Sequence, residues 1–424
     1  MNTVRFPYGR SFIEHTFDEG CELCVLRGKI NEYVPDADES ALVEAALARP
    51  VGSERLSVLA KGKKKITVIA SDHTRPVPSR ILMPALLREI RLGSPDAEIT
   101  ILIATGCHRE TTLSELEAKF GSDIVRNERI IVHDCDDAEH LRCIGKLPSG
   151  GACVLNSVAL DADLLVSEGF IEPHFFAGYS GGRKSVLPGV ASRETVLANH
   201  CSEFIAHPNA RTGCLEGNPI HEDMLWAAKE ARLAFILNVV LNEDKKIIFA
   251  AAGDVSSAHG AGVEFLSSLC RVSTVPADVV VTTNGGYPLD QNVYQSVKGM
   301  TAGEAAVKKG GVIIMCSESG DGIGGEHFYR QLADEADVSR TMTEFLKRQR
   351  GETVPDQWQT QIMLRVLMHA TVIYISSVDD ETVRQMHMIP AHSIGEALDI
   401  AKKLLGQEKL SVNAIPDGVS VIVK

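Results

Sequence analysis

The chain has 424 residues, of which 44% are hydrophobic, and its 43 basic and 56 acidic side chains give a formal net charge of −13. This length exceeds the about 250–300 residues at which a single hydrophobic core stops growing, so we expect two domains. The acidic balance, with no block of Lys or Arg, argues against a nucleic acid as the main partner, whereas a small anion needs only a few local cations.

No stretch of the sequence is predicted to cross a membrane. The most apolar run, residues 233–241, is broken by Asn238 and is shorter than the about 20 residues that a membrane span requires. The ten cysteines do not form a disulfide pattern, and the C-x-x-C of Cys21 and Cys24 has no second pair to complete a metal site. We therefore expect a cytoplasmic protein with structural thiols and no membrane partner.

Strand and helix patterns alternate regularly through the first part of the chain. Short apolar runs predict buried parallel strands, and amphipathic stretches with capping residues predict helices. Strands are expected at residues 65–70, 99–104, 129–132 and 162–166, and helices at 40–48, 79–91 and 112–120. A hairpin is expected from residues 235–241 and 247–251, followed by a helix at 257–270. This alternation is typical of a doubly wound sheet.

The pattern restarts near residues 271–278, where we place the domain boundary. Strands are then expected at 279–282, 312–315 and 372–376, and helices at 302–308, 359–369 and 394–405. The prediction is an α/β fold with two Rossmann-like domains, each a mainly parallel sheet flanked by helices, with the active site in the interdomain cleft. The domains are expected at residues 1–272 and 273–405, and the β-like end of the chain, 406–424, is expected to return to the first domain.

The loop after the first predicted strand, residues 71–80, contains Asp72 and Arg75. Arg75 offers a planar guanidinium for a carboxylate or a phosphate, and Asp72 can accept hydrogen bonds from a ligand rich in hydroxyl groups. The structural alternative is an Asp–Arg pair that only holds the loop together.

His108 lies in the loop after the second predicted strand, two residues beyond Gly106. A single histidine is usually structural, but the carboxyl end of a strand is where ligands bind in open α/β sheets. This position makes His108 a candidate catalytic residue.

Residues 172–200 contain the densest group of functional residue types in the chain. The segment 178–185 nearly matches a phosphate-binding P-loop, but Arg183 stands where that motif requires glycine. The glycine-rich backbone, which includes Gly181 and Gly182, together with Arg183 and Lys184, is still predicted to hold a phosphate or another anion.

His174, Lys184 and His200 lie in the same segment. A deprotonated lysine is a nucleophile or a covalent anchor, and a histidine binds metals or moves protons near neutral pH. The two histidines lack the spacing of an all-protein zinc site, so a metal here would need other ligands.

A fourth group lies in the predicted second domain, after the strand at 279–282. Tyr294 and Lys298 are four residues apart, which places them on one face of a helix, and Gln295 lies beside them. A solvated helix surface is the structural alternative. The glycines of 320–325 match the dinucleotide-binding pattern formally, but a loop is expected there instead of a nicotinamide site.

These motifs together resemble the nickel-pincer-dependent lactate racemase family of 2-hydroxyacid racemases and epimerases. The resemblance is carried by SDHTRPVPSR (71–80), ATGCHRE (104–110), EPHFFAGYSGGRKSVLPGVAS-x-ETV-x-x-NH (172–200) and YQS-x-K (294–298). It covers nearly the whole chain in order and spacing, and the third motif is long enough to be specific.

The resemblance implies a cofactor and a protein ligand for its metal. The family's cofactor is a nickel-pincer nucleotide, a pyridinium-3-thioamide-5-thiocarboxylate mononucleotide with nickel, which cofactor-biosynthesis enzymes would supply. By similarity, Lys184 would be its covalent attachment point and His200 the nickel ligand. The other expected cofactor contacts are Asp72, Arg75, Gly181, Gly182, Gln295 and Lys298.

The resemblance also implies the reaction, racemisation of a short-chain 2-hydroxy acid, with lactate first. His108 and His174 would act as opposed acid/bases while the C2 hydride moves to the cofactor and returns, through a 2-oxo acid. Arg75 and Lys298 would bind the carboxylate, and Tyr294 and Gln295 would line the substrate site. Two alternatives remain, an NAD-dependent 2-hydroxyacid dehydrogenase and a non-catalytic sensor that binds the cofactor.

Overall fold

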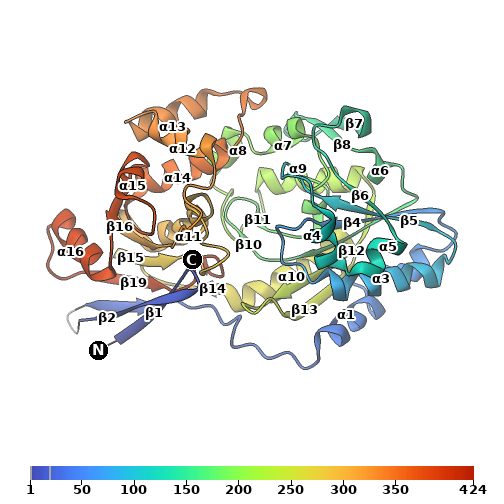
Figure 1. Ribbon diagram of the computed structural model, residues 1–424, viewed down its shortest axis with the longest axis horizontal. Helices are drawn as coiled ribbons and strands as arrows, with labels where there is room; N and C mark the ends of the chain where they lie inside the picture. The colour runs from blue at the N-terminus through green and yellow to red at the C-terminus, as the bar shows by residue number, and fades with distance from the viewer. Residues whose placement is uncertain (1, 19–20) are drawn as a thin grey trace. The chain divides into compact units, whose positions relative to one another are not determined.

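The computed structural model describes residues 2–18 and 21–424, and the chain forms two compact units (Figure 1). Unit 1 comprises Met1–Lys29, Cys201–Ala206 and Cys270–Lys424, and unit 2 comprises Ile30–His200 and His207–Leu269. Each unit contains a six-stranded sheet that is wholly or mainly parallel and is flanked by helices. The predicted fold class is confirmed.

Unit 2 is built on a sheet with strand order β13-β12-β9-β4-β5-β6. All neighbours in this sheet are parallel except β12 and β13, which form the predicted antiparallel hairpin. The strands are β4 (Lys65–Ser71), β5 (Glu98–Ala104), β6 (Arg129–Val132), β9 (Leu164–Phe170), β12 (Leu233–Leu241) and β13 (Ile247–Gly253).

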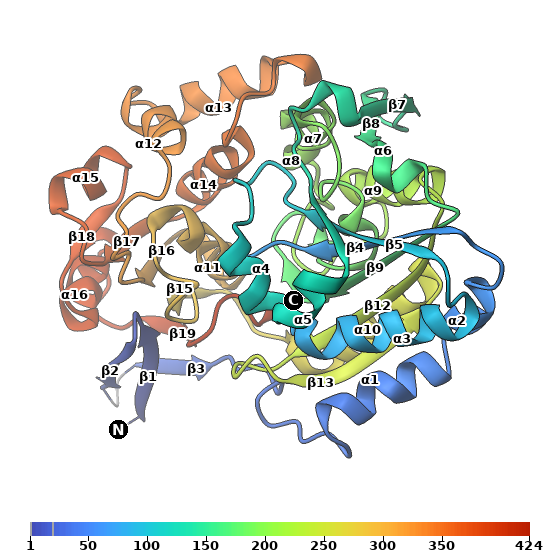
Figure 2. The ribbon, with the colours of Figure 1, turned by 45° about the vertical axis from the view of Figure 1, so that its right-hand side comes forward.

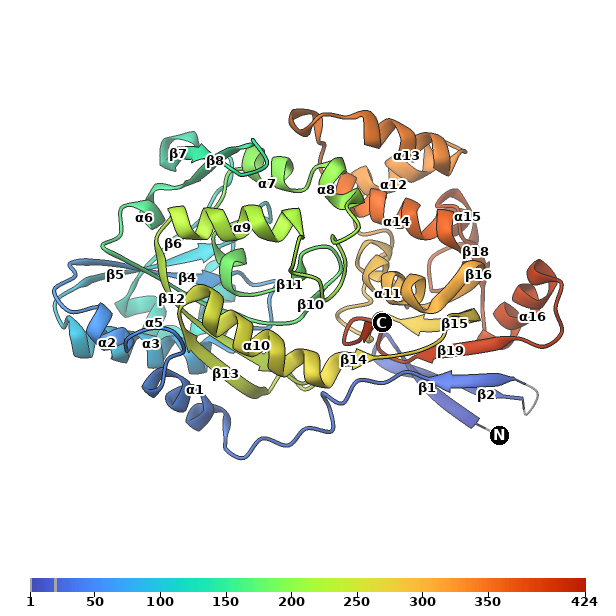
Figure 3. The same cartoon turned by 180° about the vertical axis from the view of Figure 1, so that it is seen from behind.

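Helices pack on both faces of this sheet because its strands are apolar on both sides. On one face, α3 (Ser79–Gly93) presents Leu82, Leu86 and Ile90 to the core, and α1 (Glu39–Ala48) adds Leu47 (Figure 2). On the other face lie α9 (Pro219–Glu230) and α10 (Val255–Cys270) (Figure 3).

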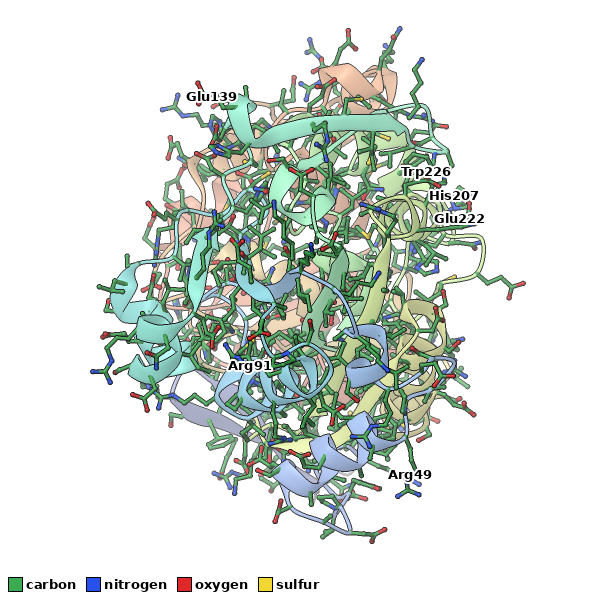
Figure 4. The ribbon with its side chains drawn as sticks, turned by 90° about the vertical axis from the view of Figure 1, so that its right-hand side faces the viewer. Arg49, Arg91, Glu139, His207, Glu222 and Trp226 are labelled. Atoms are coloured by element: carbon green, nitrogen blue, oxygen red, sulfur yellow. The ribbon has the colours of Figure 1, made fainter. Side chains whose placement is uncertain are left out.

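The remaining helices of unit 2 are short and connect or flank the strands. They are α2 (Leu56–Leu59), α4 (Leu113–Phe120), α5 (Ser122–Asn127), α6 (Ser157–Leu160) and α7 (Arg193–Asn199). Two small hairpins complete the unit: β7 (Leu141–Lys146) with β8 (Ala152–Asn156), and β10 (Pro173–His174) with β11 (Gly178–Tyr179). In Figure 4, Arg91 marks the last turn of α3, where it pairs with Glu128 at 2.6 Å, and Trp226 marks α9.

Unit 1 has the strand order β18-β17-β16-β15-β19-β3, and all neighbours are parallel. The strands are β3 (Glu22–Val25), β15 (Ala277–Thr283), β16 (Val307–Cys316), β17 (Thr371–Ile375), β18 (Ile389–Ala391) and β19 (Ser411–Ile415). Its helices are α8 (Ser202–Ala206), α11 (Val293–Ala306), α12 (Glu326–Ala333), α13 (Val338–Lys347), α14 (Gln357–His369), α15 (Asp380–Gln385) and α16 (Ile394–Leu405).

Both ends of the chain lie in unit 1, so the structure departs from the predicted boundaries (Figure 1). Residues 406–424 lie in unit 1: β19 pairs with β15 on one side and with β3 on the other, and β20 (Ile422–Val423) pairs with β14 (Arg271–Val272). The sequence signal of β19 is weak because Asn413 interrupts it. That side chain is buried and donates to the carbonyls of Val275 and Ala306, both at 3.0 Å, so the strand tolerates it.

The N-terminal hairpin of β1 (Asn2–Tyr8) and β2 (Ser11–Phe17) contributes Phe6 and Phe17 to the core of unit 1. The helix expected at 302–308 is also displaced, since α11 ends at Ala306 and β16 begins at Val307. Gly303 lies inside this helix, and the packing requires a residue without a side chain there, because a Cβ would come within 2.9 Å of Ile313. None of the helices in the described ranges has the length and apolar character needed to cross a membrane.

Candidate active site

The loops after β4 and β5 bring Asp72 and His108 together. Ser71 and Ala104 are neighbours in register, so the two loops leave the sheet at the same edge. Nδ1 of His108 lies 2.7 Å from Oδ2 of Asp72, and Thr74 donates its hydroxyl to Oδ1, also at 2.7 Å. Burial alone would raise the pKa of Asp72, but the hydrogen bonds from His108 and Thr74 outweigh it and hold that pKa below its ordinary value.

An ionised Asp72 fixes the tautomer of His108. Because a carboxylate only accepts hydrogen bonds, Nδ1 of His108 carries the proton and Nε2 is left as a base. The side chain of His108 is 44% exposed, whereas that of Asp72 is 1% exposed. A buried, oriented carboxylate behind an accessible imidazole is an arrangement suited to general base catalysis.

Asp72 and Arg75 do not form the ion pair that was the structural alternative for their loop. Among the described residues, Asp72 is paired with His108, and the guanidinium of the exposed Arg75 forms no salt bridge. The side chain of Arg75 is therefore accessible to an anionic ligand.

The segment that follows β9 carries His174, Lys184 and His200. β9 continues to Phe170, four residues beyond its predicted end. The prediction stopped early because Ser167, Glu168 and Gly169 are polar or small, although all three are buried in the strand. The β10–β11 hairpin then carries His174, a 3₁₀ turn (Gly182–Ser185) carries Lys184, and His200 caps the C-terminus of α7.

His174 and Lys184 are in direct contact, with Nε2 of the histidine 3.2 Å from Nζ of the lysine. The backbone N–H of Ala177 donates to Nδ1 of His174 at 3.3 Å, so the ring is held by the backbone on one side and contacts Lys184 on the other. The contact holds the Lys184 amine against the imidazole, and the deprotonated amine is the form in which lysine is a nucleophile.

Phe176 forms a shared apolar wall for these groups. Its ring is 4% exposed and meets the rings of His174 and His200 edge to face, with centroids 4.5 Å and 5.1 Å away. The ammonium position of Lys184 lies 5.8 Å from the centre of the same ring. Three functional side chains are therefore gathered around one buried phenyl group.

His200 is buried as a neutral ring. Burial, and next the charge of Lys184, lower its pKa to about 3. Nδ1 of His200 lies 3.0 Å from the carbonyl of Val196, which can only accept, so Nε2 carries the lone pair. A neutral imidazole with a defined Nε2 lone pair is a competent metal ligand.

The glycines of this segment are required by its backbone and its packing. Gly181 and Gly182 have φ angles of +80° and +53°. A Cβ on Gly181 would lie 2.7 Å from Oδ1 of Asn238, and the amide of Gly182 already donates to that same oxygen at 2.7 Å. The Gly182 amide is thus satisfied within the chain.

Arg183 does not face an anion site, contrary to the prediction. It is 1% exposed, and its guanidinium donates to the carbonyls of Ala177 at 2.9 Å and Gly181 at 3.2 Å. Burial lowers its pKa to about 9. Its role is to hold the turn that presents Lys184.

Tyr294, Gln295 and Lys298 lie on α11 in unit 1, the helix that follows β15, and all three are half-buried. The Tyr294 hydroxyl donates to Asp356 at 3.2 Å, and burial raises the pKa of Tyr294. The helix surface is therefore only partly solvated.

The glycine-rich segment at 320–325 caps α11. The carbonyls of Gly322 and Ile323 accept from the first amides of the helix at 3.1 Å. A dinucleotide-binding loop would offer amides to a phosphate, so these carbonyls argue against that function. A helix, α12, follows directly, although the sequence showed no clear start for it.

Three supporting residues were not identified from the sequence: Thr74, Phe176 and Asn238. Thr74 completes the hydrogen bonds of Asp72, Phe176 packs among the histidines, and Asn238 fixes the glycine turn. Asn238 had a signal, because a lone amide in an apolar strand requires a buried partner.

Two family models match the chain, the lactate racemase N-terminal domain over residues 8–213 and the lactate racemase C-terminal domain over residues 272–423. The chain belongs to the lactate racemase family. It is 54% identical to the lactate racemase of Thermoanaerobacterium thermosaccharolyticum and 50% identical to that of Lactiplantibacillus plantarum, with 100% of both chains covered in each case. The resemblance found in the motifs is confirmed, and the chain is an isomerase of the racemase type.

Solved structures agree with this assignment. The lactate racemase apoprotein from Thermoanaerobacterium thermosaccharolyticum matches with a TM-score of 0.96 at 54% identity, over 100% of both chains. A Thermotoga maritima protein matches with a TM-score of 0.63 at 20% identity, over 92% of this chain and 100% of its own, which shows a shared fold alone. Membership of the family implies a cofactor.

Proposed function

We propose that this racemase interconverts the enantiomers of a short-chain 2-hydroxy acid, with lactate as the first substrate to test. The observation that carries the proposal is the pair of defined imidazoles: His108 held by Asp72 at 2.7 Å, and His174 held between Ala177 and Lys184. The two relatives at 54% and 50% identity are lactate racemases, which supports lactate over other hydroxy acids.

The residues present fit a nickel-pincer nucleotide, the pyridinium-3-thioamide-5-thiocarboxylate mononucleotide. Lys184 has an amine suited to covalent attachment, and His200 offers the neutral Nε2 lone pair that a nickel ion requires. When bound, this group would supply a hydride acceptor for C2 of the substrate. Cofactor-biosynthesis enzymes are the proposed loading partners.

The proton steps belong to the histidines. In one direction, Nε2 of His108 takes the proton of the 2-hydroxyl group as C2 loses its hydride, and a 2-oxo acid forms. His174, which enters this direction as the imidazolium, then returns a proton to the carbonyl oxygen when the hydride adds to the other face, and the reverse reaction begins with His174 neutral and His108 protonated. Two bases are needed because the enantiomers present their hydroxyl groups on opposite sides of the planar intermediate.

The remaining residues are proposed to bind and orient. Arg75 and Lys298 would hold the substrate carboxylate, and Tyr294 and Gln295 would line the substrate site. Asp72, Arg75, Gln295 and Lys298 would also contact the cofactor. For Gly181 and Gly182 we propose a contact through the turn they permit, since the Gly182 amide already donates to Asn238.

The experiment combines loading with turnover. Full-length protein made alongside the loading enzymes should show a covalent adduct above the 45.9 kDa chain mass and should convert L-lactate to the racemate. Lys184→Ala should lose the adduct, with the exposed Lys61→Ala as a control that keeps it. Net oxidation coupled to NAD would instead support a dehydrogenase, and an adduct without turnover of any 2-hydroxy acid would support a sensor.

A further inference from the structure

Two cysteines lie next to each other one strand away from the histidine–aspartate pair. Ile103 of β5 and Val132 of β6 are neighbours in register, and Cys107 and Cys135 follow them by four and three residues. The loops are tied together beyond the sheet, because the hydroxyl of Thr105 donates to the carbonyl of His133 at 2.6 Å. The amide of His133 donates back to Ile103 at 3.0 Å.

The thiols of Cys107 and Cys135 share a hydrogen bond. This bond lowers the pKa of Cys135, and the positive charge of Arg193 lowers it further. Burial of the thiol and the negative charges of Asp136 and Asp134 raise the same pKa. The same hydrogen bond raises the pKa of Cys107. Of the two sulfurs, Cys135 is therefore the one that gives up its proton more readily.

Arg193 is held in place beside Cys135. Its backbone N–H donates to the carbonyl of Cys135 at 3.1 Å, and its guanidinium binds both carboxylate oxygens of Asp136, at 2.9 Å and 2.7 Å. A cation fixed by a bidentate pair beside a cysteine is a feature of reactive thiols.

Three other buried cysteines in the described ranges, Cys153, Cys270 and Cys316, lack this environment. Burial raises the pKa of Cys153, Cys270 and Cys316 to about 12, so these thiols stay protonated and inert. Cys107, by contrast, is half-buried and Cys135 is 6% exposed, which leaves the pair within reach of a small oxidant.

We propose that Cys107 and Cys135 form a redox-active dithiol that hydroperoxides convert to an intramolecular disulfide. The Cys135 thiolate attacks the peroxide oxygen, the O–O bond breaks, and Cys135 becomes a sulfenic acid as the peroxide is reduced to water or an alcohol. The Cys107 sulfur then attacks the Cys135 sulfur, the S–S bond forms, and the sulfenic oxygen leaves as water with the Cys107 proton. Two thiols are oxidised and one peroxide is reduced.

The disulfide would act on His108, which is the residue after Cys107. Bonded sulfurs stand about 2.05 Å apart, closer than hydrogen-bonded thiols, so the bond draws Cys107 toward β6. That shift moves His108 relative to Asp72. This last link rests on the proposed function, whereas the disulfide itself does not.

The disulfide is tested by peptide mapping of the unloaded full-length chain after treatment with hydrogen peroxide and alkylation of the remaining thiols. Trypsin places Cys107 in residues 92–109 and Cys135 in residues 130–142, each with no other cysteine. We expect these two peptides to be linked, with a mass about 2 Da below their sum, and to separate on reduction.

Variants make the mapping decisive. Cys107→Ser should lose the link and leave a sulfenic acid on Cys135 that dimedone traps, and Cys135→Ser should lose the link as a second test. Cys143→Ser, which removes an exposed cysteine next to the second peptide, should keep it. Recovery of both peptides unlinked, while Cys24 and Cys143 are oxidised, would overturn the proposal.

The effect on His108 is measured separately with loaded enzyme. Peroxide should lower turnover by about 10²-fold, restored by a thiol reductant, and Cys107→Ser should resist this loss. Equal losses in both proteins would refute the link to His108. A disulfide in a chain that racemises nothing would leave the dithiol standing and refute the proposed function.

Discussion

At the scale of single residues, the contact between Asp72 and His108 decides most of the chemistry. Its 2.7 Å hydrogen bond assigns the ring proton to Nδ1, and the burial of Asp72 keeps water from competing for the carboxylate. Asp72 is therefore a positioning residue for His108 as well as a candidate cofactor contact.

Asp72→Asn should reduce kcat by about 100-fold or more, because the amide cannot fix the imidazole tautomer as a carboxylate does. Since His108 and Asp72 act as a unit, the double variant with His108→Asn should be no slower than His108→Asn alone. Turnover of loaded protein measures both effects, with Asp123→Asn, whose side chain is 90% exposed, as the control. Additive losses would mean that Asp72 acts mainly on the cofactor.

Replacing either proposed acid/base should separate loading from turnover. His108→Asn and His174→Asn are each expected to lower kcat by about 10²–10⁴-fold while the covalent adduct persists. Intact mass and enantiomer ratios from the same samples give the two readouts. Normal racemisation by the double variant would show that other groups move the protons.

At the scale of elements, the turn at Gly181–Arg183 is the part of the site that is most constrained. Its glycines have positive φ, and the side-chain oxygen of Asn238 accepts from the Gly182 amide. The buried guanidinium of Arg183 donates to the carbonyls of Ala177 and Gly181. Lys184 follows directly, so the position of its amine depends on this turn.

Gly182→Ala should destabilise the protein more than Gly62→Ala. Both glycines have positive φ, +53° and +76°, so each alanine costs about 1–2 kcal/mol of backbone strain. Only Gly182 is crowded, with a Cβ meeting His259 at 3.0 Å, which adds about 1–3 kcal/mol, whereas nothing lies within 4 Å of a Cβ on Gly62. Urea unfolding of the two variants measures the difference in their free energies of unfolding. Equal losses of stability would show that His259 moves to make room for the added methyl group.

At the scale of the whole molecule, the sequence predicted the regularly alternating strands and helices better than the pairing of the two terminal segments. The strands of unit 2 and helix α16 follow strong apolar periodicity, and their bounds agree within a few residues. The prediction placed β3 and β19 in the same domain as the sheet of unit 2, whereas they pair with each other in unit 1, because strand pairing across the whole chain leaves no local pattern and Asn413 masks β19.

The residues of the candidate site were also predicted better than their contacts. The sequence pointed to His108, His174, Lys184 and His200 because these residue types lie at strand ends, and the structure adds their partners. It could not predict that Arg183 turns inward, since a buried arginine and an anion-binding arginine look alike in sequence.

Buried histidines should make stability depend on pH. Burial, then the charge of Arg183, lower the pKa of His259 to about 3, below that of a histidine in the unfolded chain. The unfolded chain therefore takes up a proton that the folded chain refuses, and stability falls as the pH falls below about 6.5. From pH 7 to pH 5 this single group should lower the free energy of unfolding by about 2 kcal/mol.

Urea unfolding at both pH values checks this dependence. His259→Gln should show a smaller pH dependence than the parent, and His327→Gln, which replaces an exposed histidine, should match the parent. A parent-like slope in His259→Gln would mean that the ring is protonated in the folded state.

The strand β3 gives the molecule a particular order of assembly during synthesis. Its neighbour in the sheet is β19, with Glu22 opposite Ser411, so a strand made at the start of translation has no partner until almost the end. At a ribosomal rate of about 5–20 residues per second, that strand waits on the order of 20 seconds or more. Unit 2, which is complete by Leu269, has its whole sheet available much earlier. We therefore expect the nascent chain to fold unit 2 first and to leave β3 without its partner strand until β19 leaves the ribosome.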